Sequence, residues 1–242
     1  MSYLRYVKVI GTMHVSPRSR EEVTREIERE KPAAVAVELD IPRFQGLQMG
    51  KKAELRESLR LGRAGLVSYL LTKLEEKLGE EFGMAPGGEM LGAIETAGRL
   101  GIPVLLIDED IRVIMGKILQ APLREKLFLI LEGSLVFLPG MGEEVGEKDM
   151  LSAYRDMMRE FKVRYPYLFR VLVEERNEIM ALNLKRAVDD LLARGVKRPR
   201  IIAVVGMGHK EGIERILNSW KPERRSIYPG GLGNLYNPRA AI

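Results

Sequence analysis

The chain has 242 residues and a formal net charge of +5, from 39 Lys and Arg residues against 34 Asp and Glu residues. Hydrophobic residues make up 45% and charged residues 30%, which is typical of a soluble globular domain and does not indicate a nucleic-acid partner, because the basic residues alternate with acidic ones. The absence of cysteine excludes a disulfide framework, thiolate metal ligands and a cysteine nucleophile, and it fits an intracellular setting.

The first predicted element is a strand over residues 7–11, followed at once by a turn that contains His14. Ser16 and Pro17 then provide an N-cap and a first-turn proline for a helix. No charged segment and cleavable apolar stretch precede the strand, so we expect a native start rather than a secretory signal. His14 is therefore predicted to lie between the carboxyl end of a strand and the start of a helix.

Two further buried strands are predicted in the first half of the chain, over residues 33–37 and 103–107. Both are continuously apolar, as strands covered on both faces are, and each stops at a carboxylate, Glu38 or Asp108. The sequence between these strands predicts helices over residues 51–81 and 87–100.

A long helical insertion, residues 111–195, separates the third strand from the fourth, over residues 201–205. The insertion is broken at residues 139–142 and at Pro166, and its last helix is predicted to run over residues 166–194. A helix over residues 210–218 and a tail or linker rich in Gly and Pro, residues 221–242, complete the chain. The predicted fold is an α/β domain over residues 1–220, with a mixed or parallel central sheet flanked by helices.

The chain contains only two histidines, and each completes a Gly-x-x-His sequence after an apolar strand, at His14 and His209. Polar residues thus follow all four strands, and the carboxyl ends of strands form the binding crevice of open α/β sheets. Two imidazoles and a carboxylate form a three-ligand metal site, so His14, His209 and Glu38 are the predicted ligands. The alternative is that each histidine caps a turn or a helix terminus, and that Glu38 is a solvated acid at the end of its strand.

Other residues are weaker candidates from the sequence alone. Arg43 and Arg176 could clamp a substrate, although an arginine more often pairs with a neighbouring acid. Glu89 and Glu95 lie six residues apart on one predicted helix, so at most one of them faces the site. Gly11 and Gly206 are expected to permit sharp turns and close approach of the backbone.

These residues together resemble the TraB family, also called pheromone-shutdown proteins, and the match covers nearly the whole chain in order. The resemblance implies kinship with Tiki metalloproteases and, more distantly, with erythromycin-esterase-like hydrolases. The segments that carry it are Gly11-Thr12-Met13-His14-Val15-Ser16, Val37-Glu38-Leu39-Asp40 with Arg43, Gly88-Glu89-Met90 through Ala97, Leu106-Ile107-Asp108, Glu175-Arg176-Asn177 with Met180-Ala181, and Val204-Val205-Gly206-Met207-Gly208-His209.

The resemblance implies a peptidase or related hydrolase that depends on a divalent metal, with manganese, cobalt or zinc as the candidate ions. Glu89 is the candidate base, while Arg43, Arg176 and Asn177 are candidates for orienting the substrate or stabilising an oxyanion. Two alternatives stay open: hydrolysis without metal, and a module that binds or sequesters a signal peptide or small molecule without cleaving it.

The resemblance also leads us to expect a membrane region in the natural protein. Prokaryotic members often have a carboxyl-terminal membrane region, so we expect a cytoplasmic domain of a protein that is tethered to a membrane. The apolar part of the insertion, residues 111–138, is a candidate homodimer interface. The abundance of Glu, Arg and Lys is typical of a thermophilic source.

Overall fold

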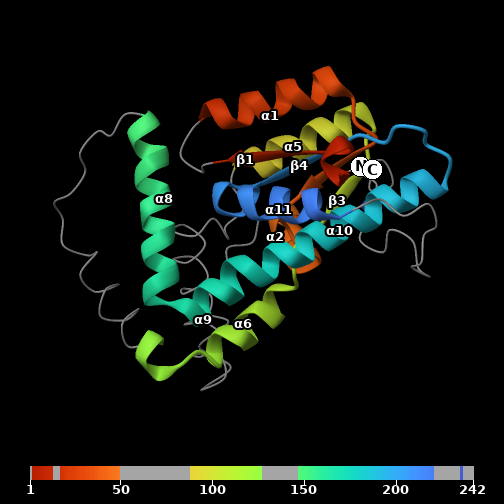
Figure 1. Cartoon of the computed structure of the whole chain (residues 1–242). Helices are drawn as coiled ribbons and strands as arrows, with labels where there is room; N and C mark the ends of the chain where they lie inside the picture. Colours follow the sequence, from red (N-terminus) through yellow and green to blue (C-terminus); the bar gives the residue numbers. More distant parts are fainter. Residues whose placement is uncertain (1, 13–16, 50–87, 127–146, 221–234, 237–242) are drawn as a thin grey trace. The chain divides into compact units, whose positions relative to one another are not determined.

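The computed structural model describes residues 2–12, 17–49, 88–126, 147–220 and 235–236 (Figure 1). These residues form two compact units. The first unit comprises Met1–Ile111 with Arg176–Ile242, and the second comprises Arg112–Glu175. The second unit lies within the helical insertion that the sequence predicts.

The first unit is built on one five-stranded sheet with the strand order β1-β4-β2-β3-β5. Neighbours among the first four strands pair in parallel, and β5 pairs with β3 in the antiparallel sense, so the predicted α/β fold is confirmed. The strands are β1 (Val7–Thr12), β4 (Ile201–Gly206), β2 (Ala34–Val37), β3 (Val104–Leu106) and β5 (Leu235–Tyr236). The β5 strand lies inside the range predicted as a tail, and its pairing with β3 joins that part of the tail to the sheet.

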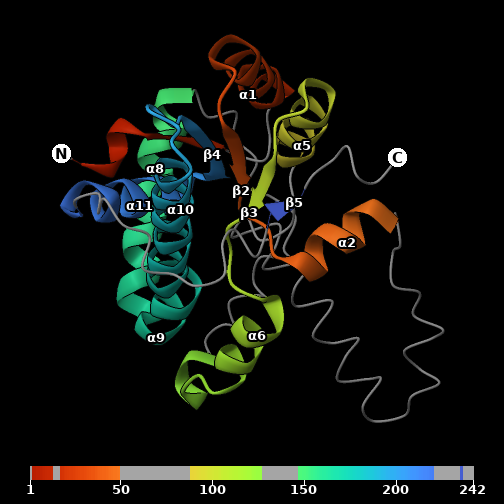
Figure 2. The same ribbon diagram turned by 90° about the vertical axis from the view of Figure 1, so that its right-hand side faces the viewer.

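Helices cover both faces of this sheet, as Figure 2 shows for the first unit. One face carries α1 (Pro17–Glu30) and α5 (Gly88–Leu100), and the other carries α10 (Glu175–Ala193) and α11 (Met207–Ser219). Successive residues of a strand point to opposite faces, so Ala36 of β2 joins the core under α10 and α11, while Val37 joins the core under α1 and α5. Burial on both faces explains the continuous apolar runs in the sequence.

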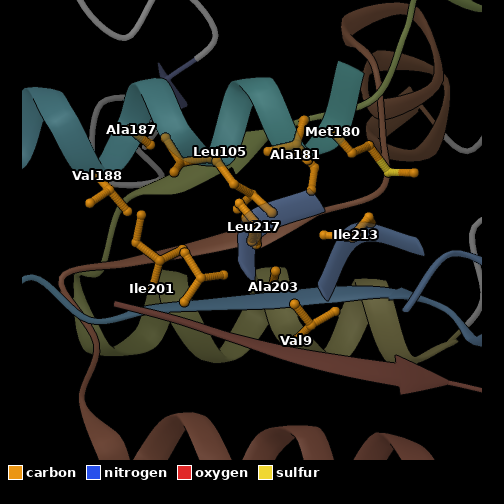
Figure 3. Close-up of a cluster of buried hydrophobic side chains, with 14 of the residues drawn as sticks. Val9, Leu105, Met180, Ala181, Ala187, Val188, Ile201, Ala203, Ile213 and Leu217 are labelled. Carbon is orange, nitrogen blue, oxygen red and sulfur yellow. The ribbon is translucent and has the colours of Figure 1, made fainter. Parts of the chain in front are cut away.

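The core under α10 and α11 is drawn in Figure 3. Met180 and Ala181 from α10 and Ile213 and Leu217 from α11 lie over strand residues such as Ala203. Small residues in the strands and in α10 let the helices pack closely on the sheet. This packing fixes the amino-terminal ends of both helices relative to the strand ends, where the candidate site lies.

The short helix α2 (Ile41–Met49) follows β2 and was not predicted from the sequence. Its start has two ordinary helix signals, because Pro42 is in the first turn and Asp40 accepts a hydrogen bond from the backbone N–H of Arg43 at 2.9 Å. The predicted helix over residues 51–81 and the predicted break at 139–142 lie outside the described residues.

The second unit contains α6 (Ile111–Leu119), α8 (Glu147–Arg164), α9 (Pro166–Phe169) and the π-helical turn η2 (Arg170–Glu174). The helix predicted over residues 166–194 is thus three consecutive segments, α9, η2 and α10. The buried carboxylate of Glu125 accepts hydrogen bonds from the backbone N–H groups of Tyr167 and Leu168, which have no partner inside the first turn of α9. No helix in the described ranges is both long and apolar enough to cross a membrane.

Candidate functional site

The carboxyl ends of the parallel strands lie at one edge of the sheet, and polar side chains gather there. Glu38 directly follows β2, and Asp108 comes two residues after β3. Because α10 leads into β4 and runs opposite to the strands, its first residues, Arg176 and Asn177, lie at the same edge. This arrangement unites residues from the first, middle and last parts of the chain.

His209 reaches this edge from a helix and not from the loop that the sequence predicted. The α11 helix begins at Met207 immediately after β4, three residues earlier than expected, so His209 occupies its first turn. Gly206 has φ −60° and ψ 147°, a conformation open to any residue, so the sharp glycine turn predicted there is wrong. At Gly11 the expected close approach is found, because an added Cβ would lie 3.0 Å from Cδ of Lys210.

Glu38 is the centre of the contacts at this edge, and only 1% of it is exposed. Its Oε2 accepts a hydrogen bond from the backbone N–H of Gly206 at 2.7 Å. Its Oε1 accepts a hydrogen bond from Nη2 of Arg176 and lies 3.3 Å from Nε2 of His209. Glu38 is therefore held in place by β4 and α10, and the solvated strand-end acid that the sequence left open is excluded.

The imidazole of His209 is also buried, with 3% exposed. Its Nδ1 lies 2.8 Å from Oδ1 of Asn177, an oxygen that can only accept a hydrogen bond. Burial lowers the pKa of His209, Glu38 opposes that shift, and Arg176 adds to it, with a net lowering. In the neutral tautomer with the proton on Nδ1, the ring donates to Asn177 and the lone pair of Nε2 faces a carboxylate oxygen.

Arg176 is buried, with 1% exposed, and it forms ion pairs with Glu38 and Asp108. Its Nε and Nη2 donate to the two oxygens of Asp108 at 3.1 and 2.7 Å, and Nη2 also donates to Glu38. Burial alone would lower the pKa of Arg176, but Asp108 and Glu38 raise it above the ordinary value. For Asp108 the directions are reversed, because burial alone would raise its pKa. The positive charges of Arg176 and Arg43 outweigh the effect of burial and hold the pKa of Asp108 well below its usual range.

Arg43 is the second arginine of the cluster. Its Nη2 donates to Asp108 at 2.5 Å, and its Nε donates to Asp40 at 2.9 Å. Asp40 also accepts a hydrogen bond from the backbone N–H of Ile111. Both predicted arginines therefore pair with neighbouring acids, which is the commoner alternative that the sequence left open.

Asp40 and Asp108 are the members of this cluster that were not among the predicted catalytic or metal-binding residues. Asp40 lies two residues after Glu38 at the end of a buried strand, directly before a helix, in one of the segments that carry the family resemblance. The five charged groups carry three negative charges, on Glu38, Asp40 and Asp108, and two positive charges, on Arg43 and Arg176. With His209 neutral, these five groups, counted among the residues that the structure describes, have a net charge of −1.

Two predicted residues are not joined to this cluster by the described contacts. Glu89 is buried in the first turn of α5, which runs opposite to the strands and so begins at the same edge of the sheet. His14 lies outside the described residues. The strand that leads to it ends at Thr12, and Thr12 pairs with Gly206, the residue before α11.

The metal-ligand set His14, His209 and Glu38 stays a prediction. No group of three or more His, Asp or Glu side chains with metal-binding geometry occurs among the residues that the structure describes, and these do not include His14. Two of the three predicted ligands, His209 and Glu38, do lie side by side.

Comparison with known proteins identifies relatives of the whole domain. A family model described as the TraB/PrgY/gumN family matches residues 5–120. An uncharacterized protein of Methanocaldococcus jannaschii is 35% identical over 222 residues, which cover 87% of this chain and 53% of that protein. The human and bovine TraB domain-containing proteins are each 30% identical, over 86% of this chain and 62% of their own length.

The chain spans between about half and two thirds of the length of these relatives. The family match covers the elements from β1 to α6, and the alignments with the relatives cover 86% to 87% of the chain. The chain belongs to the TraB/PrgY/gumN family.

Proposed function

We propose that this domain is a divalent-metal-dependent hydrolase that acts on a peptide or a related carbonyl compound, with His14, Glu38 and His209 as the metal ligands. The observation that carries the proposal is the 3.3 Å distance between Nε2 of His209 and Oε1 of Glu38. Both atoms are electron-pair donors in the tautomer that carries the ring proton on Nδ1, where Oδ1 of Asn177 can accept it. Two donors that face each other in a buried setting favour a cation between them.

The residues fit a divalent ion in distance and in charge. Two ligands of one tetrahedral ion, with bonds near 2.1 Å, are separated by about 3.4 Å, and the observed separation is 3.3 Å. The buried cluster of Glu38, Asp40, Asp108, Arg43 and Arg176 carries a net charge of −1, and a buried net charge is costly unless a counter-ion is close. Manganese, cobalt and zinc all accept imidazole and carboxylate ligands.

A bound divalent ion would supply Lewis acidity, which polarises a carbonyl and makes water nucleophilic near neutral pH. The residues of the chain have separate tasks. Arg176 and the N–H of Gly206 hold the two oxygens of Glu38, so that this ligand does not need to reorganise. Glu89 is the candidate base that accepts the proton of the attacking water.

The structure favours a supporting task for the two arginines. Arg176 and Arg43 already form buried ion pairs with Glu38, Asp108 and Asp40, so turning either guanidinium group toward a substrate oxyanion would disturb these pairs. We therefore propose that Arg176 positions Glu38, and that Arg43 positions Asp108 and Asp40. The alternative, in which the arginines orient the substrate, is disfavoured because both are held in buried ion pairs.

A panel of fluorogenic peptides, incubated with the domain and with manganese, cobalt or zinc, tests the proposal. We expect cleavage that a chelator abolishes and that added metal restores. Glu89→Gln should lose cleavage at least 100-fold while it still binds metal, because only the proton acceptor is removed. Glu95→Gln, on the same helix and paired with Arg20 at the surface, is the matched control and should cleave normally.

The two alternatives predict different results in the same assay. Cleavage that resists the chelator would identify a metal-independent hydrolase. Intact peptides that remain bound after long incubation with metal would identify a binding or sequestration module. Either result contradicts the proposed function.

A further inference from the structure

We infer that Asn177 is a positioning residue that fixes the tautomer of His209, and that Gly212 keeps the space that this asparagine needs. Asn177 is buried at the start of α10, and its Oδ1 lies 2.8 Å from Nδ1 of His209. A contact to the ring nitrogen, and not to substrate, is its task in this geometry. The inference concerns the protein without metal, so its first part does not depend on the proposed function.

Gly212 lies one helical turn after His209 on the same side of α11. A Cβ added at Gly212 would lie 2.2 Å from Nδ2 and 2.9 Å from Cγ of Asn177, which is far inside contact distance. The amide of Asn177 therefore rests against the backbone of α11, at a point where only glycine leaves room for it. The helix backbone and the ring of His209 together define the position of this amide.

Two acceptors compete for the single N–H proton of the neutral ring. Oδ1 of Asn177 is at 2.8 Å from Nδ1, near the best distance for a hydrogen bond, whereas Oε1 of Glu38 is at 3.3 Å from Nε2. Glu38 already accepts hydrogen bonds from Arg176 and from the N–H of Gly206. Asn177 therefore places the proton on Nδ1, and Nε2 stays free to act as an electron-pair donor.

The tautomer can be measured directly because the chain has only two histidines. Long-range proton–nitrogen NMR spectra of the uniformly nitrogen-15-labelled, chelator-treated protein separate protonated from unprotonated ring nitrogens, and His14→Gln assigns the remaining ring to His209. We expect a protonated Nδ1 and an unprotonated Nε2 in the native protein. A protonated Nε2 would overturn the inference, because Glu38 and not Asn177 would then set the tautomer.

Variants separate positioning from simple structural support. Asn177→Leu removes the acceptor and should move the proton to Nε2, where Glu38 accepts it, while Asn177→Asp keeps an acceptor and should retain the native tautomer. Gly212→Ala should displace Asn177 and shift the ring in the same direction as Asn177→Leu. Gly116→Ala is the matched control, because Gly116 is also helical and an added Cβ there meets nothing within 4 Å. Unchanged spectra in both Asn177→Leu and Gly212→Ala would overturn the inference.

A second readout rests on the proposed function. If His209 binds a metal through Nε2, Asn177→Leu should weaken zinc binding about 10- to 100-fold, and Asn177→Asp should bind zinc almost normally. Absence of zinc binding by the native protein would reject the proposed function and leave the tautomer result standing. Equal zinc affinity in the native protein and Asn177→Leu would reject the positioning role.

Discussion

Nε2 of His209 lies 3.3 Å from Oε1 of Glu38, and each of these side chains is held by a different partner on α10. Asn177 binds the far nitrogen of the ring, and the next residue toward the amino terminus, Arg176, binds the carboxylate. Two adjacent residues at the start of one helix thus orient both members of the pair. Their packing against β4 and α11 makes the candidate site a product of the core and not of a surface loop.

Arg176 should be the most important charged residue for stability. Arg176→Met removes the partner of Glu38 and the bidentate partner of Asp108, so we expect the free energy of unfolding to fall by about 3–5 kcal/mol. Urea unfolding followed by circular dichroism measures this change.

Arg43→Met is the comparison for that experiment. Asp108 would keep Arg176, and Asp40 would keep the backbone N–H groups of Arg43 and Ile111, so the expected loss is smaller, about 1–3 kcal/mol. Equal losses in the two variants, or a loss below about 1 kcal/mol for Arg176→Met, would contradict the described network.

His209 should make the stability of the metal-free protein depend on pH. Burial lowers its folded pKa below the unfolded value of about 6.5, so the unfolded chain takes up the proton first as the pH falls. The stabilisation from this group is therefore complete above about pH 6.5 and is lost below it, by at most about 1.4 kcal/mol per pH unit. The measurement is urea unfolding in the presence of a chelator, at intervals between pH 5.5 and about pH 8.

His209→Gln is the reference for this titration. Native protein and variant both retain His14, so the difference between their stability curves isolates His209. We expect that difference to change below about pH 6.5 and to be flat above it. Parallel curves over the whole range would show that His209 titrates in the folded protein as it does in the unfolded chain.

Glu125 tests an independent feature of the second unit. Its carboxylate accepts hydrogen bonds from the N–H groups of Tyr167 and Leu168, at 3.2 and 3.0 Å, at the start of α9. Tyr165, the residue before that helix, makes no side-chain cap of its own. Glu125→Ala should therefore destabilise the protein by about 1–2 kcal/mol.

Glu125→Gln separates this role from an effect of charge. Thermal unfolding of the native protein and both variants measures these losses. Gln keeps a carbonyl oxygen as acceptor, so Glu125→Gln should lose clearly less stability than Glu125→Ala. An equal loss in both variants would show that the negative charge, and not the hydrogen bonding of the helix start, is what matters.

The sequence predicts the frame of this domain well because its strands are buried on both faces. All four parallel strands have strand-length apolar runs, and each observed end differs from the predicted one by at most one residue. The short helix α2 was missed because its signals, Asp40 and Pro42, lie in a segment without a clear hydrophobic period. The edge strand β5 was missed because two residues in a Gly- and Pro-rich tail carry no strand pattern.

At the site, features that depend on the local sequence could be predicted, and contacts between distant segments could not. The carboxylates that follow β2 and β3, Glu38 and Asp108, could be predicted, and so could the meeting of the parallel strand ends at one edge. The early start of α11 could not be predicted, because nothing in the sequence marks Gly206 as the last residue before a helix. The contact of Asn177 with His209 could not be predicted either, since it depends on how closely α10 and α11 pack.

The proposed function requires Glu38 and His209 to belong to one metal site. Elemental analysis after incubation with manganese, cobalt or zinc and removal of excess ion is the direct test of this assignment. We expect about one equivalent of metal on the native protein and none on Glu38→Gln, His209→Ala or His14→Ala. Asp189→Asn, an equally buried carboxylate that binds Tyr3 and Lys185, is the matched control and should retain the metal. Native protein without specific metal, or full metal content in Glu38→Gln and His209→Ala, would contradict the account.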